Sequence, residues 1–158
     1  MEKTNIEYST KKITIRINSI DCRGSVADGP GIRSVVYFQG CKKRCKACHN
    51  KSTWDLNAGK NISIEEIINT LLKNTPTKRV TISGGEPLLQ KDGLISLLIN
   101  LKKNGFNIAV YTGLEIQDVP KELFDYIDFL KYGEYIDEKR ITTKYYGSSN
   151  QKFIEIKR

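Results

Sequence analysis

Long hydrophobic runs are absent from this sequence of 158 residues. No apolar stretch approaches the roughly 18 residues that a membrane-spanning helix needs, which argues against an integral membrane protein. The first twelve residues, MEKTNIEYSTKK, also lack the apolar core of a secretory signal. We therefore expect residues 1–12 to form a polar tail, and we expect the protein to stay in the cytoplasm.

Internal repeats and low-complexity linkers are absent as well, so a single domain over residues 13–158 is the natural expectation. Hydrophobic residues make up 39% of the chain and charged residues 28%. These fractions are typical of globular proteins, and the length is sufficient for a hydrophobic core.

Acidic residues are in the minority, with 18 Asp and Glu against 26 Lys and Arg and a net charge of +8. A basic balance can indicate a nucleic-acid partner. The charges are spread along the chain, however, and no nucleic-acid-binding motif accompanies them, so we expect no such partner. One dense group interleaves with cysteines: Lys42, Lys43, Arg44 and Lys46. It is either a solvated loop or a docking site for an acidic partner or electron donor.

Hydrophobic periodicity predicts alternating strands and helices. Alternating or β-branched runs predict strands over 13–20, 34–39, 79–82, 107–111, 127–132 and 152–157. Apolar spacing of three and four predicts helices over 64–73, 91–103 and 120–126, the first opened by a capping box of Ser63 and Glu66. Glycines and a proline in segment 21–34 predict a loop. This order indicates a mainly parallel α/β sheet.

Glycine-bearing segments follow four of the predicted strands. They are Gly40-Cys41, SGGEP at 83–87, Thr112-Gly113 and Gly133-Glu134. Ligands of parallel α/β folds bind at the carboxyl ends of the strands. We therefore expect these four segments to meet at one edge of the sheet and to form the ligand site.

Three of the four cysteines fall within eight residues, in the spacing Cys41-x3-Cys45-x2-Cys48. A reducing compartment argues against disulfides, and such close spacing indicates a metal site. Thiolates suit zinc or iron–sulfur clusters. A cube of four irons takes four ligands, so three local cysteines leave one iron open to a substrate.

Two other metal sites fit the same residues. The single histidine, His49, would complete a zinc site with the three cysteines, although neighbouring Cys48 and His49 are awkward ligands for one tetrahedral ion. Cys22, 19 residues upstream of Cys41, would close the cluster as an electron-transfer centre, or it is a lone thiol. His49 itself contacts a cofactor or is a polar loop residue.

The cysteine motif resembles the signature of the radical S-adenosylmethionine superfamily. The larger block DGPGIRSVVYFQGCKKRCKACHNKSTWD, residues 28–55, is similar to the activases of glycyl-radical enzymes. Within that family, SGGEPL at 83–88, YTG at 111–113 and GSSNQ at 147–151 resemble the activator of anaerobic ribonucleotide reductase. The pyruvate formate-lyase activase is similar through residue 59 but has a much longer barrel.

Three positions depart from the family pattern. Many members have an aromatic residue before the third cysteine, where this chain has Ala47, so adenine contacts must come from elsewhere. Tyr132 precedes Gly133 where the family often has Asp, and Tyr146 precedes GSSNQ where it often has Arg. These differences affect the partner contacts and the last loop.

The resemblance implies a partial, open β/α barrel of the radical S-adenosylmethionine type. It implies a [4Fe–4S] cluster on Cys41, Cys45 and Cys48, with S-adenosylmethionine on the fourth iron. An electron from a low-potential donor breaks the carbon–sulfur bond, and the 5′-deoxyadenosyl radical takes a hydrogen atom from a glycine of anaerobic ribonucleotide reductase. No catalytic side chain is expected beyond the ligands of the cluster and the cofactor.

The resemblance also implies roles for individual residues. Cofactor contacts are expected from Ala47, His49, Asn50, Ser83, Gly84, Gly85, Glu86 and Thr112. The two glycines would let backbone approach the methionyl end, and Glu86 would accept from its ammonium group. Partner-facing residues are expected in DGPGIR, at Asp28, Gly29, Gly31 and Arg33. Ordinary turn chemistry is the alternative for the glycines, and a helix cap is the alternative for Thr112.

Two rival functions remain open at this stage. One keeps the radical chemistry but acts on another target, either pyruvate formate-lyase or a small molecule. The other is a non-catalytic iron–sulfur or zinc module for electron transfer or regulation. SGGEP argues against the second rival, because a closed cluster needs no further ligand loop.

Overall fold

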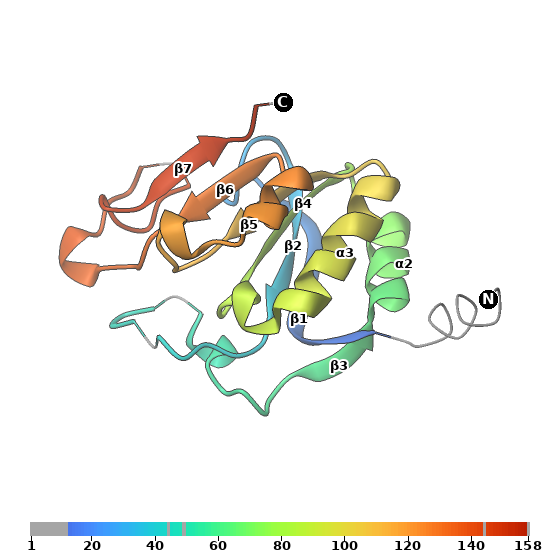
Figure 1. Ribbon diagram of the computed structural model, residues 1–158, viewed down its shortest axis with the longest axis horizontal. Helices are drawn as coiled ribbons and strands as arrows, with labels where there is room; N and C mark the ends of the chain where they lie inside the picture. The colour runs from blue at the N-terminus through green and yellow to red at the C-terminus, as the bar shows by residue number, and fades with distance from the viewer. Residues whose placement is uncertain (1–12, 44, 49, 144, 158) are drawn as a thin grey trace.

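The computed structural model of the chain describes residues 13–43, 45–48, 50–143 and 145–157. Its centre is one seven-stranded sheet in the order β3-β1-β2-β4-β5-β6-β7 (Figure 1). The strands are β1 (Thr14–Ser25), β2 (Arg33–Phe38), β3 (Lys60–Ser63), β4 (Arg79–Gly84), β5 (Asn107–Tyr111), β6 (Phe129–Tyr132) and β7 (Lys152–Glu155).

The four central strands run parallel, because β2 pairs with β4, β4 with β5, and β5 with β6. The outer strands are antiparallel: β1 joins β2 and β3, and β7 joins β6. The sheet does not close, since β3 and β7 are its two edges. The predicted fold class, an open α/β partial barrel with parallel strands at its centre, is confirmed.

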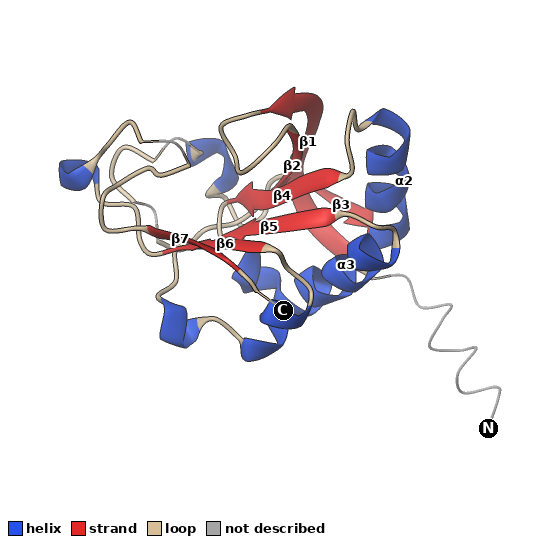
Figure 2. Cartoon of the chain, turned by 90° about the horizontal axis from the view of Figure 1, so that it is seen from above, coloured by secondary structure: helices blue, strands red, loops and turns tan. Residues whose placement is uncertain are grey.

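Two α-helices, α2 (Ile64–Asn74) and α3 (Lys91–Lys103), lie side by side on the same face of the sheet (Figure 2). The predicted cap is present, because the Ser63 hydroxyl accepts a hydrogen bond from the Glu66 amide at 3.1 Å. The core leucines of α3, Leu94, Leu97, Leu98 and Leu101, are fully buried. No helix among the described residues is long and apolar enough to cross a membrane.

Five short 3-10 helices lie in the connections. They are η1 (Lys51–Thr53), η2 (Pro87–Gln90), η3 (Ile116–Asp118), η4 (Lys121–Asp125) and η5 (Asp137–Lys139). The short helix predicted over 120–126 is present as the 3-10 helix η4.

The two faces of the sheet differ in chemistry. Successive strand residues point to opposite faces. On β4, Val80 and Ile82 join the apolar core under the helices, whereas the buried Thr81 and Ser83 belong to the other face. On β5 the second face carries Tyr111. This polar and aromatic face is the interior of the open barrel, and the site described below lies at its rim.

Two strand predictions need correction. Residues 21–25 were expected in a loop, but β1 continues to Ser25 because β2 offers a partner, with Asp21 opposite Val35 and Ser25 opposite Arg33. β3 was not predicted. Its short, largely polar sequence gives no alternating signal, and it forms by pairing with the start of β1.

Arg33 was expected to face a partner, but its side chain is fully buried. The guanidinium donates to the Thr81 hydroxyl at 2.9 Å and to the carbonyls of Pro30, Val80 and Asn107 at 2.8, 3.0 and 3.1 Å. Burial lowers the pKa of Arg33 to about 10, so the group stays charged at neutral pH. Arg33 therefore fastens the 28–33 turn to the parallel strands.

We expect Arg33→Met to lower the free energy of unfolding by about 3 kcal/mol, because buried acceptors then lose their donors. Urea unfolding measures this. The matched control is Arg23→Met, at an arginine whose side chain is 90% exposed and pairs with Asp21 at 2.8 Å. The control should leave stability unchanged within error, and equal stability of the two variants would contradict the structural role of Arg33.

Candidate functional site

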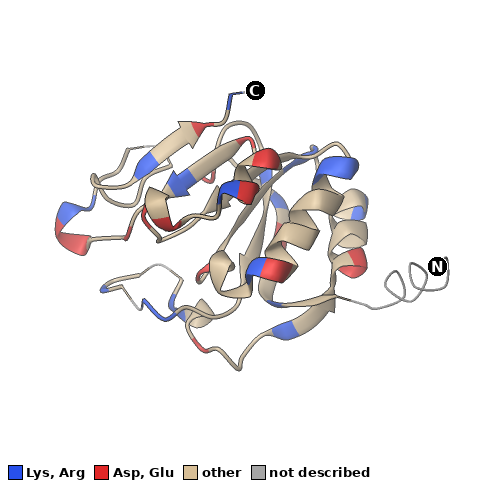
Figure 3. Ribbon diagram, viewed as in Figure 1, with Lys and Arg blue, Asp and Glu red and all other residues tan. Residues whose placement is uncertain are grey.

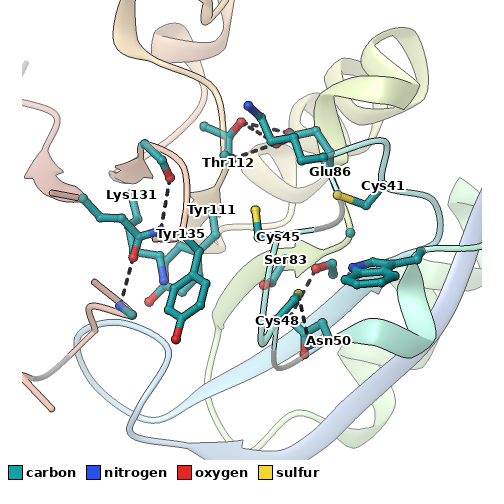
Figure 4. Close-up of a pocket in the computed structure, with 18 residues that line it drawn as sticks. Cys41, Cys45, Cys48, Asn50, Ser83, Glu86, Tyr111, Thr112, Lys131 and Tyr135 are labelled. Atoms are coloured by element: carbon teal, nitrogen blue, oxygen red, sulfur yellow. Dashed lines mark hydrogen bonds between the residues drawn. The ribbon is translucent and has the colours of Figure 1, made fainter. Parts of the chain in front are cut away.

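A pocket lies where the carboxyl ends of β2, β4 and β5 meet the cysteine loop (Figure 4). Cys41, Cys45 and Cys48 line it together, and each is partly buried. The four glycine-bearing segments each contribute lining residues: Cys41, Gly84, Gly85, Glu86, Thr112, Gly113 and Gly133. The expectation that these segments meet at one edge of the sheet is confirmed.

Hydrogen bonds fix the two ends of the cysteine loop. The amides of Gly40 and Cys41 donate to the carbonyls of Thr53 and Trp54 at 2.6 and 3.2 Å. Asn50 supports the middle, because its amide contacts the Cys48 sulfur at 3.4 Å and its side chain donates to the Gly84 carbonyl at 3.3 Å. The loop is thereby held against the end of β4, and Trp54 lines the pocket beneath it.

Gly84 and Gly85 allow this loop to approach β4 closely. A β-carbon on Gly84, which has φ +115°, would stand 2.3 Å from the backbone nitrogen and oxygen of Phe38. A β-carbon on Gly85 would stand 2.2 Å from the carbonyl oxygen of Gly40. The glycines are therefore required first by backbone packing between the two loops. The predicted approach of a ligand to this backbone would be a second reason for glycine at these two positions.

Glu86 is a buried carboxylate, 4% exposed, at the floor of the pocket. It accepts from the Gly113 amide at 2.7 Å, the Leu88 amide at 3.0 Å and the Thr112 hydroxyl at 2.8 Å. Burial is the main cause that raises its pKa, and these hydrogen bonds oppose the rise. The Thr112 hydroxyl contacts both carboxylate oxygens, at 2.9 and 2.8 Å, so the three donors hold the whole carboxylate in place.

Four further lining residues were not predicted: Tyr111, Lys131, Tyr135 and Gln151. Gln151 accepts from the amides of Gly147 and Ser148 and donates to the Gly133 carbonyl, so it ties the last loop to the end of β6. Two of these residues lie in motifs that the sequence analysis names, Tyr111 in YTG and Gln151 in GSSNQ. Lys131 carried no such signal, because its position follows from which face of the strand it takes.

Tyr111 and Lys131 form an incompletely satisfied pair. The Lys131 ammonium lies 4.0 Å from the centroid of the Tyr111 ring. Burial lowers the pKa of Lys131 to about 8, and the Asp28 carboxylate opposes this. The Tyr111 hydroxyl is buried without a hydrogen-bond partner among the described residues, and burial raises its pKa. A buried hydroxyl without a partner that lines a pocket is a candidate contact for a ligand.

A second cavity continues from the first. Both cavities are lined by Asn50, Ser83, Tyr111, Lys131 and Gly147. The second also reaches the 26–28 turn and residues 140–143 and 145–147. Asp28, which was predicted to face the partner, lines this second cavity. The sequence gave no other indication of the cavity.

The remaining predicted residues lie in various places. His49 falls outside the described residues, as does Arg44. Ala47 is exposed with φ +58° and is not among the residues lining the cysteine pocket. Gly31 is exposed, whereas Gly29 is buried against Arg33.

Cys22 packs against the hydrophobic core and does not line the pocket, which argues against a cluster closed by Cys22.

A model of the 4Fe-4S single cluster domain matches residues 27–154, most of the chain. The chain belongs to this family. Its match spans the cysteine loop, both cavities and the strands that carry them. The family description agrees with the cluster predicted from the cysteine spacing.

Curated relatives in the sequence comparison are pyruvate formate-lyase-activating enzymes. Those of Clostridium pasteurianum and Staphylococcus epidermidis are 47% and 38% identical over 102 and 111 residues, which is 61% and 66% of this chain. The Escherichia coli K12 enzyme is 38% identical over 102 residues. The chain spans about two fifths of the length of these relatives: 42%, 44% and 41%, respectively.

Among solved structures, QueE from Escherichia coli has a similar fold. The TM-score is 0.54 at 24% identity, over 63% of this chain and 52% of QueE. This likeness concerns the fold alone, and it agrees with the open barrel described above.

The residues present fit an iron–sulfur cluster. The three sulfurs stand around one cavity, and no group of three or more His, Cys, Asp and Glu among the described residues is set to hold a single metal ion. A cluster takes one thiolate per iron, so separate positions suit it. Burial raises the pKa of the Cys45 thiol, with Glu134 adding to the rise, and a metal centre would stabilise the thiolate. The family and the activating-enzyme relatives together support the predicted pair of cofactors, the cluster and S-adenosylmethionine.

We expect Gly85→Ala to displace the cysteine loop, because its β-carbon overlaps the Gly40 carbonyl, and to lower stability by about 1–3 kcal/mol. Iron bound after anaerobic reconstitution should fall well below one cluster per chain. Gly113→Ala is the matched control, since its β-carbon meets the flexible Lys43 side chain at 2.9 Å. Full iron loading of Gly85→Ala would refute the packing argument.

The lowered pKa of Lys131 predicts that the stability of the protein depends on pH. This pKa of about 8 lies below the ordinary lysine value, so between pH 8 and about 10 the unfolded chain binds more protons than the folded one. The free energy of unfolding should therefore gain up to about 3 kcal/mol from this group as the pH rises through that window. Lys131→Met should remove the gain, as judged by urea unfolding at each pH, and parallel pH profiles of the two proteins would disprove the assignment.

Proposed function

We propose that the chain is the cluster-binding part of an activase that cleaves S-adenosylmethionine and generates a glycyl radical on a partner enzyme. The observation that carries this proposal is the shared pocket of the three cysteines and the Glu86–Thr112–Gly113 network. An electron-transfer module would need the cysteines but not a buried carboxylate in the same pocket.

When bound, the [4Fe–4S] cluster supplies an open iron and the electron that breaks the carbon–sulfur bond of S-adenosylmethionine. The chain's own residues bind the cluster and the cofactor and orient them. Cys41, Cys45 and Cys48 hold the cluster, and Glu86 accepts from the ammonium group of the methionyl moiety. Charge-assisted hydrogen bonds of this kind are stronger than neutral ones.

Asn50 and Ser83 complete the proposed cofactor contacts, and Thr112 supports them through Glu86. Asn50 and Ser83 line both cavities, so they stand between the cysteines and the second cavity. The Thr112 hydroxyl is committed to Glu86, and it therefore positions the carboxylate. Ala47 lies exposed outside this pocket, so the adenine contacts are expected from the second cavity.

The second cavity is the proposed entry for the partner's glycine. Asp28 and residues 140–143 and 145–147 line it, and it shares lining residues with the pocket of the cysteines. A hydrogen atom can be taken from a protein glycine only if extended backbone reaches the cofactor. A cavity contiguous with the cofactor pocket meets that requirement.

Pyruvate formate-lyase is the favoured partner, because the relatives at 38–47% identity activate that enzyme. The sequence prediction preferred anaerobic ribonucleotide reductase, and the comparisons support its alternative better. Ribonucleotide reductase stays a second candidate on one observation: Gly147 and Gln151 of the GSSNQ segment line the pocket.

Anaerobic reconstitution should give about four irons per chain. With dithionite, methionine and 5′-deoxyadenosine should form from S-adenosylmethionine. Cys41→Ala should abolish both cluster and products, and Cys22→Ala, at a thiol outside the pocket, should keep both.

Electron paramagnetic resonance of each candidate partner after incubation would then identify the target. A glycyl-radical signal on pyruvate formate-lyase alone is the expected result. A cluster without cleavage products would refute the activase and leave the electron-transfer module.

A further inference from the structure

A small surface cavity lies on the other side of the cysteine loop from the cofactor pocket. It is lined by Arg16, Gln39, Lys42, Leu56, Leu89 and Gln90. Two of its residues are large exposed hydrophobics, Leu56 at 46% and Leu89 at 41%. Lys42 is exposed beside them, and no carboxylate among the described residues lines this cavity. The surface therefore combines two exposed leucines with the cations Lys42 and Arg16.

Hydrogen bonds make this surface a firm platform. The Gln90 side chain accepts from the Arg16 amide at 2.8 Å and donates to the Arg16 carbonyl at 2.9 Å. The Gln39 side chain donates to the carbonyls of Ser52 and Asp55 at 3.1 and 2.7 Å. Both glutamines join separate segments of the chain, so the exposed leucines sit on backbone that is already fixed.

The platform adjoins the residues that hold the cluster. Lys42 follows the proposed ligand Cys41, and consecutive side chains diverge: Lys43 lines the cofactor pocket, whereas Lys42 lines the platform. Leu56 packs over Gly40, where an added β-carbon would stand 2.9 Å from it. Figure 3 shows Lys and Arg at several points along this loop. Electron transfer weakens steeply with distance, so this is a short route to the cluster that leaves the partner's cavity open.

We propose that this platform, which we call the Lys42–Leu89 surface, docks the acidic low-potential protein that reduces the cluster. The inference rests on the proposed function, which consumes one electron in each cleavage. The donor is oxidised by one electron, the cluster is reduced by one electron, and no bond forms at the docking surface. A small patch that combines apolar and positive side chains suits a transient redox encounter steered by charge.

The test compares two reductants on the reconstituted full chain. One is dithionite, which needs no docking surface, and the other is an acidic flavodoxin kept in its fully reduced form. Lys42→Glu and Leu89→Ser should each lower kcat/KM for the flavodoxin by about tenfold, mainly through KM. Both should match the unaltered protein in 5′-deoxyadenosine formation with dithionite.

Matched controls separate this surface from a general charge or solubility effect. Lys46→Glu makes the same charge change on the same loop, at a residue that lies outside the cavity and 3.7 Å from Glu138. Leu72→Ser removes a leucine that is 45% exposed on α2. Both controls should keep the flavodoxin-driven rate.

An unchanged flavodoxin KM in Lys42→Glu and Leu89→Ser would overturn the inference, and so would an equal loss in Lys46→Glu. Failure of the unaltered protein to cleave S-adenosylmethionine with dithionite would overturn the proposed function itself, and the docking surface with it.

Discussion

The close contact between two backbone segments, 38–40 and 84–86, sets the position of everything else in the site. The parallel ladder of β2 and β4 ends with Phe38 opposite Gly84, and the pairing continues into the loops. The Gly85 amide donates to the Phe38 carbonyl at 3.0 Å, and the Glu86 amide donates to the Gly40 carbonyl at 2.8 Å. The first cysteine and the buried carboxylate consequently leave adjacent strands at the same height. Side chains at either glycine would force these strands apart.

The sheet supplies two environments from a single set of strands. Toward α2 and α3 it presents an apolar core, and toward the barrel interior it presents Arg33, Tyr111, Lys131 and their neighbours. Arg33 is satisfied by four acceptors, so it is part of the framework. The Tyr111 hydroxyl is buried without a hydrogen-bond partner among the described residues, and the Lys131 ammonium lies over its ring. Arg33 therefore stabilises the fold, whereas Tyr111 has an unused polar group facing the pocket.

The proposed activities divide the surroundings of the cysteine loop between three participants. The cofactor would occupy the pocket of the three cysteines, the partner's glycine would enter through the second cavity, and the electron donor would dock outside the loop. The arrangement follows from the loop itself, whose consecutive residues Lys42 and Lys43 face different cavities. Such a division lets reduction and substrate binding proceed without competing for the same surface.

The sequence by itself determined the local features. These are the cysteine spacing, the Ser63 cap, the leucines of α3 and the glycine segments after the strands. Each feature depends on residues only a few positions apart, so the sequence alone reveals it. Only the tertiary structure decided that Arg33 is buried, that Cys22 belongs to the core, and that Tyr111, Lys131 and Gln151 reach the pocket. It also decided that β1 continues to Ser25 and that β3 exists. The reason is physical: a strand residue's environment depends on the sheet register and on the segment packed opposite, and both are contributed by residues far away in the chain.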